Sequence, residues 1–278
     1  MFAELIESWI TPCPAEGRRL GYLRESIALG ARHRRCREAW QDHLAQTRVA
    51  LLASLSCCRS HRIALVFGSG ALLDVPLEEL AGRFEDVWLV DAVHPLAARR
   101  QMRRYSNVQP IVHDVTECVF GLPDLGLPTA VDLQRLAGRS PGRFLDENRI
   151  DWVASVNLFS QLHLLPVAWL QRHQPQLDDA ALNAFAVALL RRHLDYLAAF
   201  RAPVCLVADL EQTTRNVATG EMIERTDLSN FFVGWPEPFA AWDWELAPPG
   251  ELARDVESLH RVGAFYVNEP WISHRSLS

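Results

Sequence analysis

The residues of this sequence with the clearest chemical potential stand where continuous apolar runs stop. Gly68 and Gly70 follow the first run, Asp91 ends the second and Asp114 ends the third. Glycines have no Cβ, so a ligand can approach the backbone closely at such a turn. Asp91 comes about 20 residues after Gly70, where a dinucleotide-type site has the carboxylate that accepts hydrogen bonds from the ribose hydroxyls. The pattern indicates a nucleotide-like ligand, and a glycine turn that merely joins a strand to a helix is the alternative.

The apolar runs that carry these residues predict the strands of a parallel sheet. Each run is short and nearly continuous in apolar character, which is typical of strands buried on both faces. Because the carboxyl ends of parallel strands meet along one edge, the glycine turn and the two aspartates are expected at one crevice. A helical pattern after Gly70 is expected to present its unpaired N–H groups there. The expected strands are 62–67, 86–91, 108–114, a fourth within 151–162, and 204–211.

In the order of these strand ends, residues 62–209 resemble the class I S-adenosylmethionine-dependent methyltransferases. The resemblance implies an α/β fold with a doubly wound, mostly parallel seven-stranded sheet, N-terminal helices and a late antiparallel hairpin. It also implies S-adenosyl-L-methionine as the cofactor. In that family the glycine turn packs the methionine part, the acid after the second strand holds the ribose, and the acid after the third lies near the adenine. Carried over to this chain, the implied contacts are Gly68, Ser69 and Gly70, then Asp91 with Ala92, Asp114 with Val115, and Ser155 with Asn157 beside the sulfonium.

Two positions depart from the family's pattern. Val66 stands where the family usually has an acid two residues before the first glycine, and Leu72 stands where it often has a third glycine. Both positions bear on how the methionine end is held, and Asp74 or Ser69 is the candidate to compensate. An inactive descendant that keeps the fold is the alternative.

The candidate general base is His163, which follows the fourth strand. The methyl group of a sulfonium is already activated, so the protein has to align the nucleophile, exclude water and, for some acceptors, remove a proton. A histidine that only makes a structural hydrogen bond is the alternative. No metal is expected, because the six cysteines include no CxxC pair and match no histidine spacing.

Three function classes fit these patterns, and the fold by itself does not choose among them. The first is a methyltransferase acting on a small molecule, with an oxygen, nitrogen or sulfur acceptor left open. The second is a non-catalytic protein that binds S-adenosylmethionine or regulates through the same fold. The third is an NAD-dependent oxidoreductase, which Asp91 would suit, but Leu73 in place of the third glycine and the absence of Lys argue against it.

The chain before the first strand is predicted to be helical. Residues 18–56 have apolar residues at three- and four-residue spacing, in about two helices split near Gly30. We therefore expect a helical extension over 1–60 that packs on the core, and one methyltransferase-type domain over 61–278. That domain is expected to contain insertions at about 120–149 and 212–245 and two late strands at 242–246 and 262–267.

Substrate choice is expected to depend on segments outside the parallel strands. Residues 120–148 are rich in Gly and Pro and come at the carboxyl side of a strand, where scaffolds place binding loops, so they are predicted to act as a lid. The N-terminal helices are expected to cap the crevice as well. Trp235, Trp242 and Trp244 are candidates for an aromatic wall, with core packing as the alternative.

Composition and charge narrow the possible partners. The chain has 278 residues and a net charge of −6, and all 28 basic residues are Arg. A negative chain has no general attraction to nucleic acid, so the expected partner is a small molecule, aromatic or anionic. No apolar run approaches the roughly 20 residues of a membrane span, and the start of the chain, with Glu4 and Glu7, lacks the basic region of a signal peptide. A cytoplasmic protein is expected, and its oligomeric state stays open.

Overall fold

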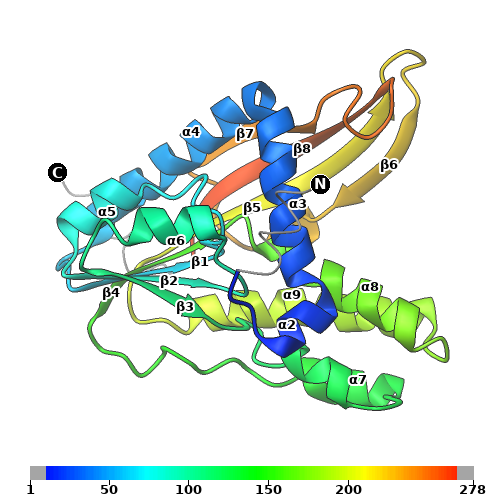
Figure 1. Ribbon diagram of the computed structural model, residues 1–278, viewed down its shortest axis with the longest axis horizontal. Coiled ribbons are helices and arrows are strands. Elements are labelled where there is room, and N and C mark those ends of the chain that lie inside the picture. The colour runs from blue at the N-terminus through cyan, green and yellow to red at the C-terminus, as the bar shows by residue number, and fades with distance from the viewer. Residues whose placement is uncertain (1–10, 268–278) are drawn as a thin grey trace.

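A computed structural model describes residues 11–267 of the chain. Glu4 and Glu7, on which the signal-peptide expectation depends, lie outside these residues. A twisted sheet runs through the molecule with helices on both faces (Figure 1). Within the described part, every helix is too short or too polar to cross a membrane. One face carries α4 (Arg37–Ser54), α5 (Leu77–Arg83) and α6 (Leu96–Met102), and the other carries α7 (Ala130–Ala137), α8 (Leu164–His173) and α9 (Asp179–Ala198).

Residues 11–267 contain eight strands, seven of which follow the order β3-β2-β1-β4-β5-β8-β7. The first five strands in this order are parallel to one another, whereas β8 runs antiparallel to both β5 and β7. The predicted doubly wound α/β fold, with its mostly parallel sheet and late antiparallel hairpin, is confirmed. The strands are β1 (Ile63–Phe67), β2 (Asp86–Asp91), β3 (Val108–Val112), β4 (Ile150–Val156), β5 (Val204–Asn216), β6 (Met222–Asp227), β7 (Ala240–Ala247) and β8 (Val256–Tyr266).

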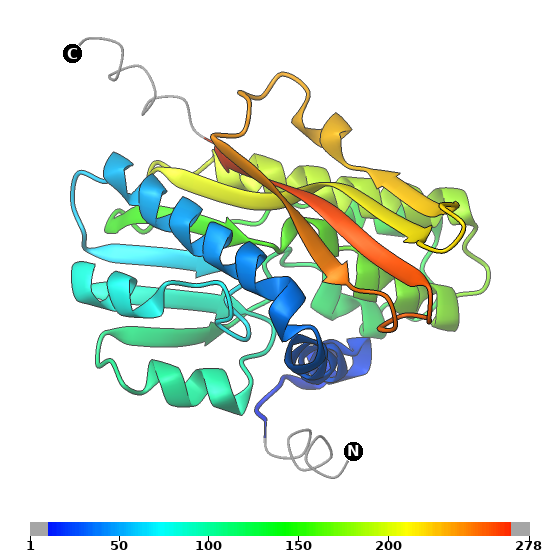
Figure 2. The same ribbon diagram turned by 90° about the horizontal axis from the view of Figure 1, so that it is seen from above.

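The sequence pattern did not indicate β6 or the distal part of β5. β5 continues to Asn216, five residues past its predicted end, and pairs there with both β6 and β8. These residues are polar and β6 is largely exposed on both faces, so no apolar run marks them. They are strands because a neighbouring strand pairs with them, which is a tertiary effect. Figure 2 shows β5, β6 and β8 extending beyond the parallel part of the sheet.

The N-terminal helices α2 (Ala15–Leu20), α3 (Tyr22–Arg35) and α4 break at different places from the one predicted. The expected break near Gly30 is wrong, because α3 continues through that residue. A glycine inside a helix costs only about 1 kcal/mol, which tertiary packing outweighs. The chain bends instead at Gly21, whose φ is 95°, and at Cys36. α3 stands across the carboxyl ends of the parallel strands (Figures 1 and 2).

The helix expected directly after the glycine turn is displaced along the chain. α5 begins only at Leu77, with Pro76 at its N-cap, and residues 68–76 form a loop. Proline removes a backbone donor and restricts the residue before it, so a helix begins more readily at this point than before it. The expectation that a helix N-terminus faces the ligand beside Gly70 is therefore wrong.

The segment 120–148 contains α7 and the 3₁₀ helix η2 (Val119–Asp124). A capping box between Thr129 and Asp132 starts α7. Its buried residues Leu133 and Leu136 belong to a core cluster that includes residues of α8 and α9. The buried face of α7 therefore packs on the helical layer formed by α8 and α9.

Candidate functional site

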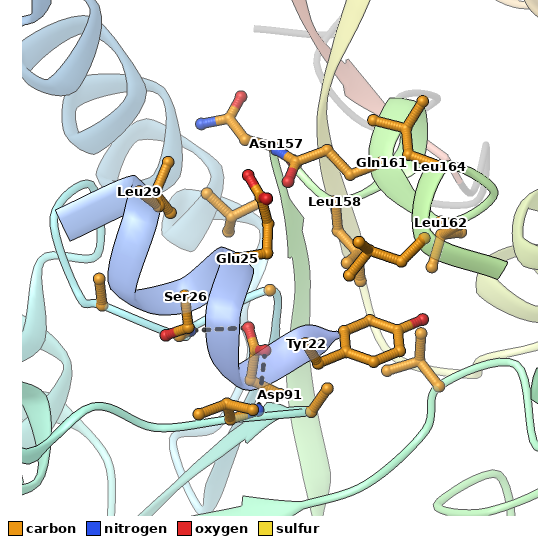
Figure 3. Close-up of a pocket in the computed structure, with 18 of the residues that line it drawn as sticks. Tyr22, Glu25, Ser26, Leu29, Asp91, Asn157, Leu158, Gln161, Leu162 and Leu164 are labelled. Atoms are coloured by element: carbon orange, nitrogen blue, oxygen red, sulfur yellow. Dashed lines mark hydrogen bonds between the residues drawn. The ribbon is translucent and has the colours of Figure 1, made fainter. Parts of the chain in front are cut away.

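A cavity of about 420 Å³ opens at the carboxyl ends of the parallel strands. This volume lies within the range of sites for small ligands. The loops after β1, β2 and β3 and the end of β4 form one side of it, and α3, α4, α8 and β7 close it from the others. Figure 3 shows Tyr22, Glu25 and Leu29 of α3 facing Asn157, Leu158 and Gln161 across this space.

Only glycine fits the backbone conformation at position 68. Its φ is 78°, a conformation that residues with a Cβ rarely adopt, and a Cβ there would lie 2.4 Å from the carbonyl oxygen of Val156. The close approach joins the ends of β1 and β4. Leu72, at the position of the family's third glycine, has a φ of 59°, so the backbone keeps the conformation that glycine favours although the residue is Leu.

Asp91 lies half-buried between the glycine turn and the cavity. Its Oδ2 accepts a hydrogen bond of 2.8 Å from the backbone N–H of Gly70, and its Oδ1 accepts one of 3.3 Å from that of Val93. Loss of hydration raises the pKa of Asp91 to about 6, although the backbone N–H of Gly70 acts in the opposite direction. The carboxylate has lone pairs left for further donors, so it can accept hydrogen bonds from a ligand's hydroxyl groups.

Asp114 shapes the loop after β3. Its Oδ1 accepts from the Thr116 hydroxyl at 2.6 Å, and its Oδ2 accepts from the backbone N–H of Phe120 at 3.0 Å. These bonds fix the loop that carries Val115 along the cavity wall. Ala92 lines the same wall after β2. Gly68, Gly70, Asp91 and Asp114 are called the aspartate side of the cavity below.

The two serines expected at the site have their hydroxyl groups directed away from the cavity. The Ser69 hydroxyl is buried and lies 3.1 Å from Nε2 of His94. The Ser155 hydroxyl is fully buried and lies 2.9 Å from Nε2 of His193, on the α9 side of the sheet. Neither hydroxyl lines the cavity, because successive residues of a strand point to opposite faces and the turn directs Ser69 inward.

His163 does not line the cavity either, although its neighbours Leu162 and Leu164 do. It stands at the N-cap of α8, where burial lowers its pKa. The expected base is therefore not placed to remove a proton from a ligand in this space.

A group of aromatic residues that the sequence did not single out together closes the other end. The rings of His43 and Trp244 stack at 3.9 Å between centroids, and Trp40 contacts Trp244 edge-on at 5.2 Å. All three line the cavity and are called its aromatic side. Trp242 and Trp244 alternate along β7, a period-two signal for one face of a strand. Trp235 packs against Phe232 and Phe265 instead.

His43 is fixed as a hydrogen-bond donor toward the cavity. Its Nδ1 accepts from Nε1 of Trp242 at 3.1 Å, and burial lowers its pKa to about 4. The neutral ring therefore carries its proton on Nε2. Nε2 lies 3.2 Å from Nδ2 of Asn157, so two N–H donors stand side by side at this point of the cavity wall.

Asn157 and Asp74 form a polar pair beside the glycine turn. Nδ2 of Asn157 donates to Oδ2 of Asp74 at 2.7 Å, and both residues line the cavity. Burial raises the pKa of Asp74, while the bond from Asn157 lowers it. Asn157 has a φ of 48°, which asparagine tolerates better than most residues. Of the two candidates to compensate for Val66, Asp74 therefore faces the cavity and Ser69 does not.

The segment predicted to be a lid contributes little to this site. The structure describes all of residues 120–148, and among them Phe120 alone lines the cavity. The cover comes from α3 and α4, which were also expected to cap the crevice. The lid expectation for 120–148 is wrong, because its buried residues Leu122, Leu133 and Leu136 pack in the core cluster with α9 and not over the cavity.

The strand order and the late hairpin are those of the class I methyltransferase sheet, so the predicted resemblance in fold is confirmed. A scan against protein-family models finds no match, and no curated protein matches the chain. The function inferred for this chain rests on the geometry of its own cavity.

Several solved structures are similar to this chain in fold, at low sequence identity. One is the Burkholderia thailandensis 1,6-didemethyltoxoflavin-N1-methyltransferase with 1,6-didemethyltoxoflavin and S-adenosylhomocysteine bound, 14% identical over 93% of this chain and 92% of that one, with a TM-score of 0.43. Another is a Leishmania major SAM-dependent methyltransferase, 15% identical over 89% and 82%, with a TM-score of 0.39. A third is an rRNA methylase from Streptococcus thermophilus, 11% identical over 76% and 92%, with a TM-score of 0.27.

Proposed function

We propose that this protein is a methyltransferase that uses S-adenosylmethionine and acts on a small molecule. The observation that carries the proposal is Asp91, a carboxylate at the end of β2 that stands beside Gly70 in the wall of the cavity. No Arg or His within the described residues pairs with Asp91 by hydrogen bond or ion pair. A ligand with two adjacent hydroxyls would satisfy it.

The residues of the cavity fit the parts of this cofactor. Asp91 would hold the ribose hydroxyls, and the loop fixed by Asp114 would lie along the adenine. Asp74 and Asn157 would hold the methionine end, where Asp74 supplies the negative charge that Val66 does not. S-adenosylmethionine, when bound, supplies a methyl group on a positively charged sulfur, which is already activated for transfer.

The protein's own part in the reaction is to orient two molecules and exclude water. The helices α3 and α4 cover the strand ends and make the cavity enclosed enough for this task. We therefore propose that the helical extension expected over 1–60, which the structure describes from residue 11, completes the site of the domain expected over 61–278, which it describes to residue 267. A cavity of about 420 Å³ suits a small molecule better than a nucleic acid.

Calorimetric titration of the purified protein tests the proposal. We expect S-adenosylhomocysteine and S-adenosylmethionine to bind and NAD not to bind. Binding of NAD in preference to both would overturn the proposal and favour an oxidoreductase. Absence of binding for all three would exclude the cofactor role of Asp91.

A further inference from the structure

We infer that the methyl acceptor is an amine with a flat apolar body, an inference that rests on the proposed methyl transfer. The cavity is lined by the carboxylates of Glu25, Asp74, Asp91 and Asp114. Of the described residues that line it, none is Arg, and the chain contains no Lys. Such a site attracts a positive group and repels a negative one.

The guanidinium groups next to the cavity are turned to other partners. Nη2 of Arg48 donates to the backbone carbonyl of Leu73. Nη1 of Arg143 lies 3.1 Å from Nδ1 of His113, with its guanidinium over the Phe144 ring. An anionic acceptor, one of the two expected from the sequence, therefore finds no cation in the cavity wall.

Glu25 is the carboxylate left over for the acceptor. Asp91 and Asp114 belong to the aspartate side, and Asp74 already accepts from Asn157. The Glu25 side chain has no hydrogen bond or ion pair within residues 11–267. Figure 3 shows its carboxylate projecting from α3 into the cavity toward Asn157 and Gln161.

The aromatic side of the cavity is the basis for the acceptor's flat apolar body. The buried rings of His43, Trp244 and Trp40 pack against one another and border this end of the cavity with largely apolar surface. Leu29 and Leu44 complete it with apolar surface.

An amine needs a group that takes up its proton, and Glu25 is suited to this. An acceptor bound as an ammonium has no free lone pair, so it first releases one proton to the Glu25 carboxylate. The lone pair then forms the new N–C bond while the C–S bond breaks with its electron pair left on sulfur, and the methylated nitrogen keeps the positive charge. Glu25 is exposed at its outer side and can pass that proton to water. His43 cannot take it at Nε2, because that nitrogen already carries a proton when Nδ1 accepts from Trp242.

Three probes that differ in charge test the inference. Tyramine, tyrosol and 3-(4-hydroxyphenyl)propionate share a phenol ring and carry a positive, a neutral and a negative end. Each is titrated calorimetrically into the full chain saturated with S-adenosylhomocysteine. We expect tyramine to bind at least about tenfold more tightly than the propionate, and Glu25→Gln to reduce that ratio to about threefold or less.

The matched control is Glu38→Gln, an exposed glutamate on α4 that does not line the cavity. It should keep the preference for tyramine, and both variants should bind S-adenosylhomocysteine as the wild type does. Equal or tighter binding of the propionate, no uptake of any probe, or a preference that survives Glu25→Gln would overturn the inference while leaving the cofactor proposal intact. Failure of S-adenosylhomocysteine to bind would instead count against the proposed function.

Discussion

The aspartate side and the aromatic side of the cavity are built in different ways. On the aspartate side, Gly70 and Asp91 are 21 residues apart and meet because β1 and β2 are adjacent parallel strands. On the aromatic side, His43 meets Trp242 over a separation of 199 residues. The first side is made of turns that follow directly from strand pairing, whereas the second exists only when α4 packs against β7.

The two sides of the cavity should therefore respond differently to substitution. The aspartate side depends on backbone geometry, so even one added carbon should disturb it. The aromatic side depends on side-chain packing, so its variants should lose acceptor binding and some stability while the cofactor site persists. Three substitutions test whether the two sides of the cavity respond in these different ways.

The largest effect is expected for Gly68→Ala. The new Cβ would lie 2.4 Å from the Val156 carbonyl oxygen in a backbone with a φ of 78°, so strand ends must separate. We expect a loss of about 4 kcal/mol in the free energy of unfolding, measured by urea denaturation, together with loss of S-adenosylhomocysteine binding. Gly82→Ala is the control, because nothing lies within 4 Å of the Cβ it adds to α5, and it should stabilise slightly.

Asp91→Asn should change stability and binding in opposite directions. The folded protein holds the Asp91 proton more tightly than the unfolded chain, since its pKa is about 6 rather than 3.8. Wild-type stability therefore falls as the pH rises from about 4 to about 6, by at most about 3 kcal/mol from this group. The variant lacks this loss, so above pH 6 it should unfold at higher urea concentration than the wild type.

The same variant should bind S-adenosylhomocysteine more weakly by about 1.5–3 kcal/mol, as expected for hydrogen bonds to a charged group. Asp86→Asn, at the opposite end of β2, removes a surface ion pair with Arg149 and is the control for charge. A variant that bound as tightly as the wild type would show that Asp91 is a structural residue of the turn only.

The smallest effect is expected for His43→Phe, on the aromatic side. The ring stack is kept in part, but Nε1 of Trp242 loses its acceptor, which should cost about 1–3 kcal/mol of stability. Affinity for S-adenosylhomocysteine should stay within about twofold, and tyramine binding should weaken. His163→Gln is the control and should change neither stability nor the binding of either ligand. A large loss of binding in this variant would show that His163 belongs to the site.

Local patterns were sufficient for the part of the site made by neighbouring strands. Apolar runs predicted β1 to β5 in order, and the residues directly after them supplied Gly68, Gly70 and Asp91. The sequence also placed Leu72 at a glycine position, and its φ of 59° shows that the backbone kept the turn. These features follow from short-range geometry, because a parallel strand and its turn fix where the next residues stand.

Local sequence patterns were thus enough for the five parallel strands, the late hairpin, the glycine turn and the carboxylates at the strand ends, but not for β6 or the distal part of β5. Only the tertiary structure decided that Ser155 faces His193, that residues 120–148 pack on α9, and that the cavity is closed by Glu25, His43 and Trp244. The reason is physical. A periodic pattern shows that a face of a helix or strand is buried, but the partner it meets depends on how elements distant along the chain pack together.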